Sequence, residues 1–119
     1  MIKQYTKQES DIENRFLKDL QIEILKNHLK IIFLLSIKRN GALSGYDLLQ
    51  RIQNKYRVNL SPGTIYTQLY TLERKNLLKG QVDSSGKRVY SLTSDGIKAT
   101  EIILSSRNQI EKVFNSLLE

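Results

Sequence analysis

The sequence contains no cysteine, no tryptophan, one proline and one histidine. Without cysteine the chain has no disulfide, no thiolate metal ligand and no cysteine nucleophile. His28 would have to serve any Ser-His-Asp hydrolase or histidine-based metal site, yet it lies inside an apolar helical pattern. A lone histidine in that setting is expected to be a structural or dimer-interface residue. The twelve carboxylates are scattered along the chain, so we expect no enzyme, no metal site and no cofactor.

Long apolar runs are also missing. The longest uncharged and mainly apolar run, residues 31–37, is far shorter than the roughly 20 residues that a membrane span needs. The opening stretch MIKQYTKQESD is polar and lacks the apolar centre of a secretory signal. We therefore expect a soluble cytoplasmic protein without a membrane partner.

The net charge of +7 is concentrated in the middle of the sequence. Residues 1–37 and 89–119 are each close to neutral, whereas residues 38–88 carry three acidic side chains against ten basic ones. A segment with such an excess is attracted to a polyanion, whereas charge that serves only solubility is usually mixed in sign. The basic residues of this segment are Lys38, Arg39, Arg51, Lys55, Arg57, Arg74, Lys75, Lys79, Lys87 and Arg88.

Helical periodicity begins near Asp11, after a first segment of residues 1–10 that we interpret as a flexible tail. Apolar residues recur at helical spacing up to about residue 39, and Ser10 with Glu13 resembles a capping box. The spacing predicts one long helix or two helices with a break. The Asn40-Gly41 pair is expected to end it.

Two shorter helices are expected next, over residues 44–56 and 62–76. Ser44 precedes the first and has an acid, Asp47, three residues later. Ser61-Pro62 is a strong start for the second, because serine accepts a hydrogen bond from a free amide and proline needs no donor at the first helical position. The link between the two helices is short.

The pattern then alternates as in strands. Residues 77–92, the wing, read as a hairpin with Leu78, Val82, Tyr90 and Leu92 on one face and with Lys79, Gln81, Asp83 and Arg88 pointing elsewhere. The turn around Gly86 suits a positive φ. Residues 93–119 are expected to form a final helix.

The final helix carries an apolar stripe that needs a partner surface. The stripe can fold back on the first helix, pair with another copy of the chain, or do both. Its candidate dimerisation residues are Ile103, Ile110, Phe114 and Leu117.

This order of elements, three helices followed by a two-strand hairpin and a helix, is that of a winged helix-turn-helix domain. The expected fold is therefore mainly α with a small β-hairpin. Residues 11–92 would form the DNA-binding domain, and the long terminal helices would form a dimer interface.

The helix over residues 62–76 should turn Ile65, Leu69 and Leu72 toward the core. Its opposite side then presents hydroxyl groups, phenols and one guanidinium, which can bind phosphates and read base edges. For Ser61 the capping role is the favoured interpretation. The candidate DNA-binding residues of the helix and the wing are Ser61, Gly63, Thr64, Tyr66, Thr67, Tyr70, Thr71, Arg74, Lys87 and Arg88.

Several residues of the predicted helices and wing resemble those of a known protein family. The sequence is similar to the PadR family of transcriptional regulators over about residues 15–98. The similarity is carried by Gly45-Tyr46, the run SPGTIY over residues 61–66, the Leu69…Leu72-Glu73 pair, Arg88, Tyr90 and the Leu92-Thr93…Gly96 stretch. The short C-terminal segment resembles the compact branch of that family. The resemblance implies a homodimer that binds double-stranded operator DNA through the third helix and the wing, and usually represses transcription.

Three positions depart from the family pattern. Thr67 stands where the family commonly has proline, and Tyr70 and Thr71 stand where it commonly has basic residues. The base preference of relatives therefore does not transfer to this chain. Family members that bind flat aromatic drugs often use a tryptophan in the dimer cavity, and this chain has none. A small-molecule effector stays open, and nothing in the sequence indicates one.

Two other functions compete with sequence-specific regulation. A winged helix can act as a protein-interaction adaptor, although an adaptor needs neither an acid-free helix face nor cations at the wing tip. A nucleoid-associated protein would bind DNA through charge alone, with a steep salt dependence and no preferred sequence. The sequence favours an inverted-repeat operator bound by a dimer.

Overall fold

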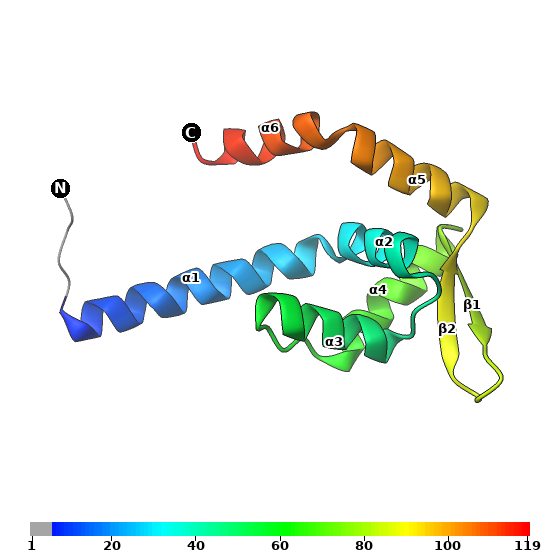
Figure 1. Cartoon of the computed structure of the whole chain (residues 1–119). Coiled ribbons are helices and arrows are strands. Elements are labelled where there is room, and N and C mark those ends of the chain that lie inside the picture. The colour runs from blue at the N-terminus through cyan, green and yellow to red at the C-terminus, as the bar shows by residue number, and fades with distance from the viewer. Residues whose placement is uncertain (1–5) are drawn as a thin grey trace.

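The computed structural model describes residues 6–119, which form six helices and a two-stranded antiparallel hairpin (Figure 1). The first helix, α1 (Lys7–Asn27), starts at Thr6, whose hydroxyl accepts a hydrogen bond from the Glu9 amide in a complete capping box. The helix therefore begins before the predicted Ser10, and only residues 1–5 of the expected flexible tail lie outside the described residues. Thr6-x-x-Glu9 and Ser10-x-x-Glu13 have the same capping pattern, and the earlier one is used.

Of the two alternatives predicted for the first helical segment, the structure has two helices with a break, and the break falls at His28. The second helix, α2 (Leu29–Asn40), starts there, after two residues of modest helix propensity, Asn27 and His28. The His28 ring packs edge-on against Phe114, with 5.1 Å between the ring centroids. The only histidine therefore has a structural position at a helix junction.

Helix α2 runs through the centre of the domain. Leu29, Phe33, Leu34 and Ile37 are all buried, and α2 contacts α4, α5 and β2. Residues 31–37, the longest apolar run of the sequence, therefore lie in the central helix of the domain. Figure 1 shows α1 continuing away from this centre as a separate arm, and none of its residues is buried.

The helix-turn-helix pair follows as α3 (Gly45–Tyr56) and α4 (Pro62–Arg74). Ser44 and Asp47 form the predicted cap of α3, and the Ser61 hydroxyl accepts from the Thr64 amide at the start of α4. Arg57, in a left-handed conformation with a φ of 57°, ends α3 and lets the chain turn.

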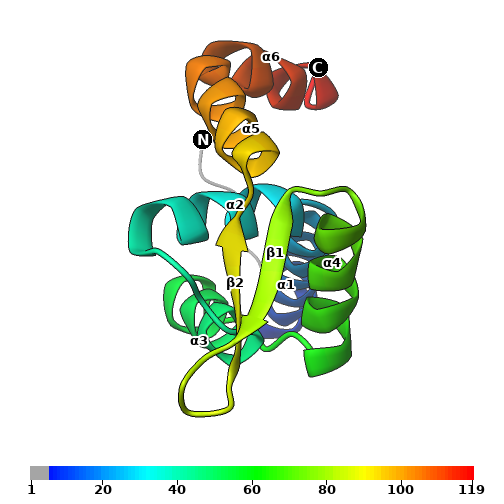
Figure 2. The same ribbon diagram turned by 90° about the vertical axis from the view of Figure 1, so that its right-hand side faces the viewer.

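The wing consists of β1 (Leu78–Val82) and β2 (Arg88–Leu92), joined at the tip by a turn with Gly86 at a φ of 85°. Leu78 pairs with Leu92, Gly80 with Tyr90 and Val82 with Arg88. A bridge between Leu43 and Tyr90 ties the hairpin to the chain before α3. Figure 2 shows the wing projecting past α3 and α4.

The predicted C-terminal helix is two helices, α5 (Ser94–Ser105) and α6 (Arg107–Leu117). The break falls at a pair of serines, a common place for a kink, and the Ser105 hydroxyl donates to the carbonyl of Ile102. The chain therefore changes direction between Ile103 and Ile110, so these residues do not lie on one straight stripe. Among residues 6–119 no helix is long and apolar enough to cross a membrane.

Candidate nucleic-acid interface

Helix α4 separates its apolar and polar residues as the sequence predicts. Ile65, Leu69 and Leu72 are buried in the core and less than 1% exposed. The residues on the outward side, Gly63, Tyr66, Thr67, Tyr70 and Arg74, are exposed, and Thr64 and Thr71 are half-buried. An exposed helix edge with small and hydroxyl-bearing side chains suits insertion into a DNA groove.

Several hydroxyl groups on α4 already have a partner. The Ser61 hydroxyl caps the helix and lies 2.9 Å from the Thr64 hydroxyl. The Thr71 hydroxyl donates to the carbonyl of Thr67. Thr71 therefore offers DNA an acceptor oxygen and a methyl group, whereas no intramolecular hydrogen bond of the Thr67 or Tyr70 hydroxyl is found in the described part of the chain.

A shallow hollow lies beside the start of α4. It is lined by Ser61, Gly63, Thr64, Thr67 and Gln68 from α4 and by Lys26 and Leu29 from the α1–α2 junction. The amides at a helix N-terminus favour an anion, and Lys26 adds a positive charge beside them. Neither Lys26 nor Gln68 was a predicted site residue. Lys26 lies in the nearly neutral first segment, so the charge distribution gave no signal for it.

Arg88 lies on the inner face of the hairpin. Because side chains alternate along a strand, Arg88 shares the face of Tyr90 and Leu92 and not that of Lys79 and Gln81. The prediction that Arg88 points away from the Tyr90 face was wrong for this reason. Its guanidinium carbon is 5.6 Å from the centre of the Tyr90 ring.

The Arg88 guanidinium reaches across the hairpin to α4. It donates to Glu73 at 3.0 Å. Gly80 leaves space for this path, since a Cβ at that position would come within 2.6 Å of the guanidinium. The pKa of Arg88 is raised, first by hydrogen bonding to Tyr90 and then by the charge of Glu73. Arg88 thereby neutralises the only acid on α4.

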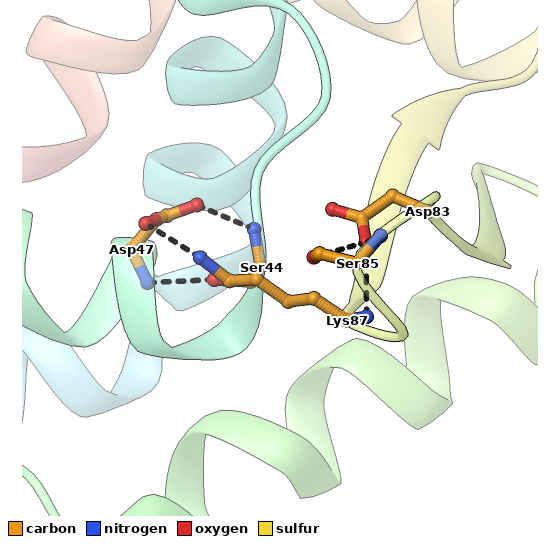
Figure 3. A network of polar contacts seen from close by, with 5 residues as sticks. All are labelled: Ser44, Asp47, Asp83, Ser85 and Lys87. Atoms are coloured by element: carbon orange, nitrogen blue, oxygen red, sulfur yellow. Dashed lines mark hydrogen bonds and ion pairs between the residues drawn. The ribbon is translucent and has the colours of Figure 1, made fainter.

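Lys87 and the turn of the wing form a second polar network (Figure 3). Asp83 accepts hydrogen bonds from the Ser85 hydroxyl and from the amides of Lys87 and Ser85, and the bond from the Ser85 hydroxyl is the main reason why the pKa of Asp83 is lowered. The Lys87 ammonium lies 3.5 Å from Asp47 in the cap of α3. The turn at the wing tip is therefore held in place by hydrogen bonds to Asp83. The Lys87 side chain stays 45% exposed although it reaches toward α3.

Asp47 links the wing to the cap of α3. Its carboxylate accepts from the Ser44 amide at 2.9 Å, and its own amide donates to the Ser44 hydroxyl at 3.0 Å. The hydrogen bond from the Ser44 amide is the main reason why the pKa of Asp47 is lowered, with the charge of Lys87 as a smaller cause. Asp47 is therefore charged at neutral pH.

The structure brings the predicted residues of α4 and the wing onto one unit, in which α4 contacts β1 and both α4 and β2 pack directly on α2. The fold and this geometry match a known family, because a model of the PadR-like transcriptional regulators matches residues 34–102. The chain belongs to the PadR-like family of transcriptional regulators. The resemblance predicted from SPGTIY and its neighbours is thereby confirmed, as is the winged helix-turn-helix fold. This is a family of DNA-binding regulators and not of enzymes.

Solved structures agree with this membership in the PadR-like family. A PadR-like regulator from Bacillus cereus is 25% identical with a TM-score of 0.66, covering 82% of this chain and 97% of its own. A PadR family regulator from Clostridium difficile is 29% identical with a TM-score of 0.63, covering 77% and 99%. Among curated protein sequences none matches the chain significantly.

A third similar structure contains DNA. Bacillus subtilis PadR in complex with operator DNA is 26% identical with a TM-score of 0.57. The match covers 64% of this chain and 46% of that protein. This chain is therefore related to a protein that binds operator DNA. It also has a basic wing and an exposed edge on α4.

Proposed function

We propose that this PadR-like regulator is a homodimeric repressor that binds an inverted-repeat operator through α4 and the wing. The observation that carries the proposal is the Arg88–Glu73 pair, because the guanidinium offsets the charge of the one acid on α4. The exposed edge from Gly63 to Arg74 then meets DNA without a repelling carboxylate. Such an edge has no use in a protein adaptor, which supports the DNA-binding function over that alternative.

In this proposal Thr67, Tyr70 and Thr71 read base edges in the major groove. The start of α4, with Ser61 and Lys26, binds a phosphate, and Lys87 contacts the neighbouring backbone or minor groove. Repression follows from the same geometry when the operator overlaps a promoter, because a dimer on the DNA blocks access to it. The protein would act at the nucleoid in the cytoplasm.

The homodimer is proposed from two sets of exposed apolar side chains. Helix α1 has no buried residue, yet it exposes Ile12, Phe16, Leu17, Leu20 and Ile24. Helices α5 and α6 expose a second set, Ile97, Ile102, Leu104, Val113, Leu117 and Leu118. Exposed apolar surface of this extent is typical of an interface. Pairing the α1 set of one copy with the α5–α6 set of another covers both.

The predicted dimerisation residues have different exposures. Leu117 is 71% exposed, whereas Ile103, Ile110 and Phe114 are half-buried within their own chain. We therefore assign the main dimer contacts to Leu117 and to its exposed neighbours Val113 and Leu118. Ile103, Ile110 and Phe114 position α5 and α6 against the domain and contribute their remaining exposed area.

Analytical ultracentrifugation tests the dimer. Phe16→Glu and Val113→Glu should each convert a dimer to a folded monomer, because each places a charge in an apolar contact. Val82→Glu is the matched control, since Val82 is an exposed apolar residue of the wing, outside both sets. A monomeric wild-type chain, or a dimer that both substitutions leave intact, contradicts the proposed assembly.

Selection of DNA from a random pool tests the operator. The proposal predicts that an inverted repeat is enriched, with half-sites about one helical turn apart. Enrichment of a single half-site would overturn the dimeric operator but keep specific binding. Recovery of no preferred sequence, with binding that only follows salt, would support the nucleoid-type alternative.

A further inference from the structure

Arg74 and Tyr70 form a stacked pair on the exposed edge of α4. The guanidinium carbon of Arg74 lies 5.7 Å from the centre of the Tyr70 ring, which is one helical turn earlier. Both side chains are exposed. Thr67, Tyr70 and Arg74 follow one another at spacings of three and four residues, so they lie along one side of the helix. The pair therefore belongs to the edge of α4 that faces away from the core.

No carboxylate holds the Arg74 guanidinium within residues 6–119, because none of the ion pairs found there includes it. The adjacent acid, Glu73, is turned by about 100° around the helix and accepts a hydrogen bond from Arg88 at 3.0 Å. Arg74 is also the one basic residue of α4. Its N–H donors therefore remain available to DNA, while the Tyr70 ring restricts the orientation of the guanidinium plane.

This stacked arrangement favours a base over a phosphate as the partner of Arg74. A phosphate attracts any exposed cation, whatever the orientation of the charged group. Two parallel hydrogen bonds to a base edge need the guanidinium fork in one plane, and stacking on an aromatic face reduces the entropy lost in holding it there. Guanine presents two neighbouring acceptors, N7 and O6, in the major groove, and arginine bonded to both is the commonest specific contact.

We propose that Arg74 reads a guanine in each operator half-site, and that Tyr70 is the residue that positions its guanidinium. The inference rests on the proposed binding of operator DNA through α4. The guanidinium donates to N7 and O6 of the guanine while one of its faces stays on the Tyr70 ring. Thr71 cannot take this role, because its single hydroxyl already donates to the carbonyl of Thr67 at 3.0 Å.

Parallel selections of DNA from a random pool locate the guanine. The wild type should enrich half-sites with one G·C pair that Arg74→Ala no longer selects, while the preferences at the other positions stay the same. Lys75→Ala removes the exposed cation directly after α4 and is the matched control. It should select the same guanine as the wild type. Melting curves check that both variants keep the fold.

Replacing that guanine by 7-deazaguanine tests the contact at one atom, since a C–H group then stands in place of N7. The replacement should weaken wild-type binding by at least about fivefold and leave the affinity of Arg74→Ala unchanged. Tyr70→Phe keeps the ring and should show the same fivefold loss. Tyr70→Leu should show a loss at least about twofold smaller, because the cation–π contact is gone. A merely structural role of Tyr70 would weaken binding to both DNAs equally and leave this ratio unchanged.

The outcomes separate this inference from the operator proposal. If Arg74→Ala selects every guanine that the wild type selects, or weakens binding to all sequences alike, Arg74 contacts phosphate; the inference then fails and the operator proposal stands. If Tyr70→Leu shows the full wild-type loss with 7-deazaguanine, Tyr70 does not position Arg74. If the wild type enriches no sequence at all, both the inference and the operator proposal are wrong.

Discussion

The Arg88 guanidinium lies 3.0 Å from the Glu73 carboxylate and so joins the second strand of the wing to α4. The two residues are 15 positions apart in the sequence. Both side chains keep some exposure, 50% for Arg88 and 27% for Glu73. A pair of this kind contributes little to stability. Its main effect is on charge, since it decides whether α4 presents an acid to DNA.

Glu73→Gln should strengthen DNA binding and steepen its salt dependence. The substitution releases Arg88, so one more cation can contact phosphate, and the slope of log affinity against log salt should increase in size by about one. The free energy of unfolding should fall by less than about 1 kcal/mol. Fluorescence anisotropy over a salt series measures this. Weaker binding by Glu73→Gln would mean that the pair positions the wing instead.

Gly80→Ala separates these two roles of the pair without changing its charges. The added Cβ would displace the Arg88 guanidinium, which lies within 2.6 Å of that position. If neutralisation of Glu73 matters, Gly80→Ala should weaken DNA binding, and Gly80→Ala with Glu73→Gln should restore it. Arg107→Gln removes an exposed ion pair on α6 and is the control. It should leave DNA binding unchanged, with or without Glu73→Gln.

Gly45 and Tyr66 form a contact that a double-mutant cycle can measure. A Cβ at Gly45 would lie 2.6 Å from the Tyr66 ring, so Gly45→Ala must move this ring on α4. We expect Gly45→Ala to weaken DNA binding severalfold. In a Tyr66→Ala background the same change should have no further effect on binding, and it should be neutral or favourable for stability, because alanine is a better helix residue. Equal binding losses in both backgrounds would contradict this.

The sequence predicted most of the local structure because its signals are local. Ser44 with Asp47 and Ser61 with Pro62 set the starts of α3 and α4, as the structure confirms. Periodicity was sufficient to find the core face of α4. It left open whether the first helical segment is broken and did not indicate the break at Ser106, because apolar residues continue at helical spacing on both sides of His28 and Ser106.

The polar contacts of the wing were beyond sequence reasoning. Asp47 and Lys87 are 40 positions apart, and only the packing of the hairpin against α3 brings them within 3.5 Å. Lys26 likewise reaches the start of α4 only because α1 ends beside it. The face of Arg88 was predictable, since two-residue alternation from Tyr90 places it inward; its charge favoured the opposite interpretation.

Asp47 predicts a pH dependence of stability. The pKa of Asp47 is lowered in the folded protein, so its contribution is complete above the ordinary aspartate pKa of 3.8 and is lost as the pH falls through the lower folded value. Asp47→Asn should therefore be slightly less stable than the wild type at neutral pH. The difference should vanish in strong acid. Melting curves from pH 7 to pH 2 measure it, and a constant difference would contradict a role for the charge.

Lys87 and Tyr70 should differ in what their loss does to DNA binding. Lys87→Ala should weaken binding to all sequences alike and reduce the salt slope by about one, because an ammonium contacts phosphate. Tyr70→Ala should instead change which bases are preferred. Competition between operator and random DNA separates the two effects. A loss of specificity on Lys87→Ala would show that the wing reads bases.

The central claim is that α4 reads a specific sequence as part of a dimer. The most direct measurement is a footprint of the purified protein on the DNA upstream of its own gene and of neighbouring genes. The account predicts one protected site that contains an inverted repeat, protected in both halves, and lost on Thr67→Ala with Tyr70→Ala. Uniform, salt-sensitive protection with no preferred site would contradict it.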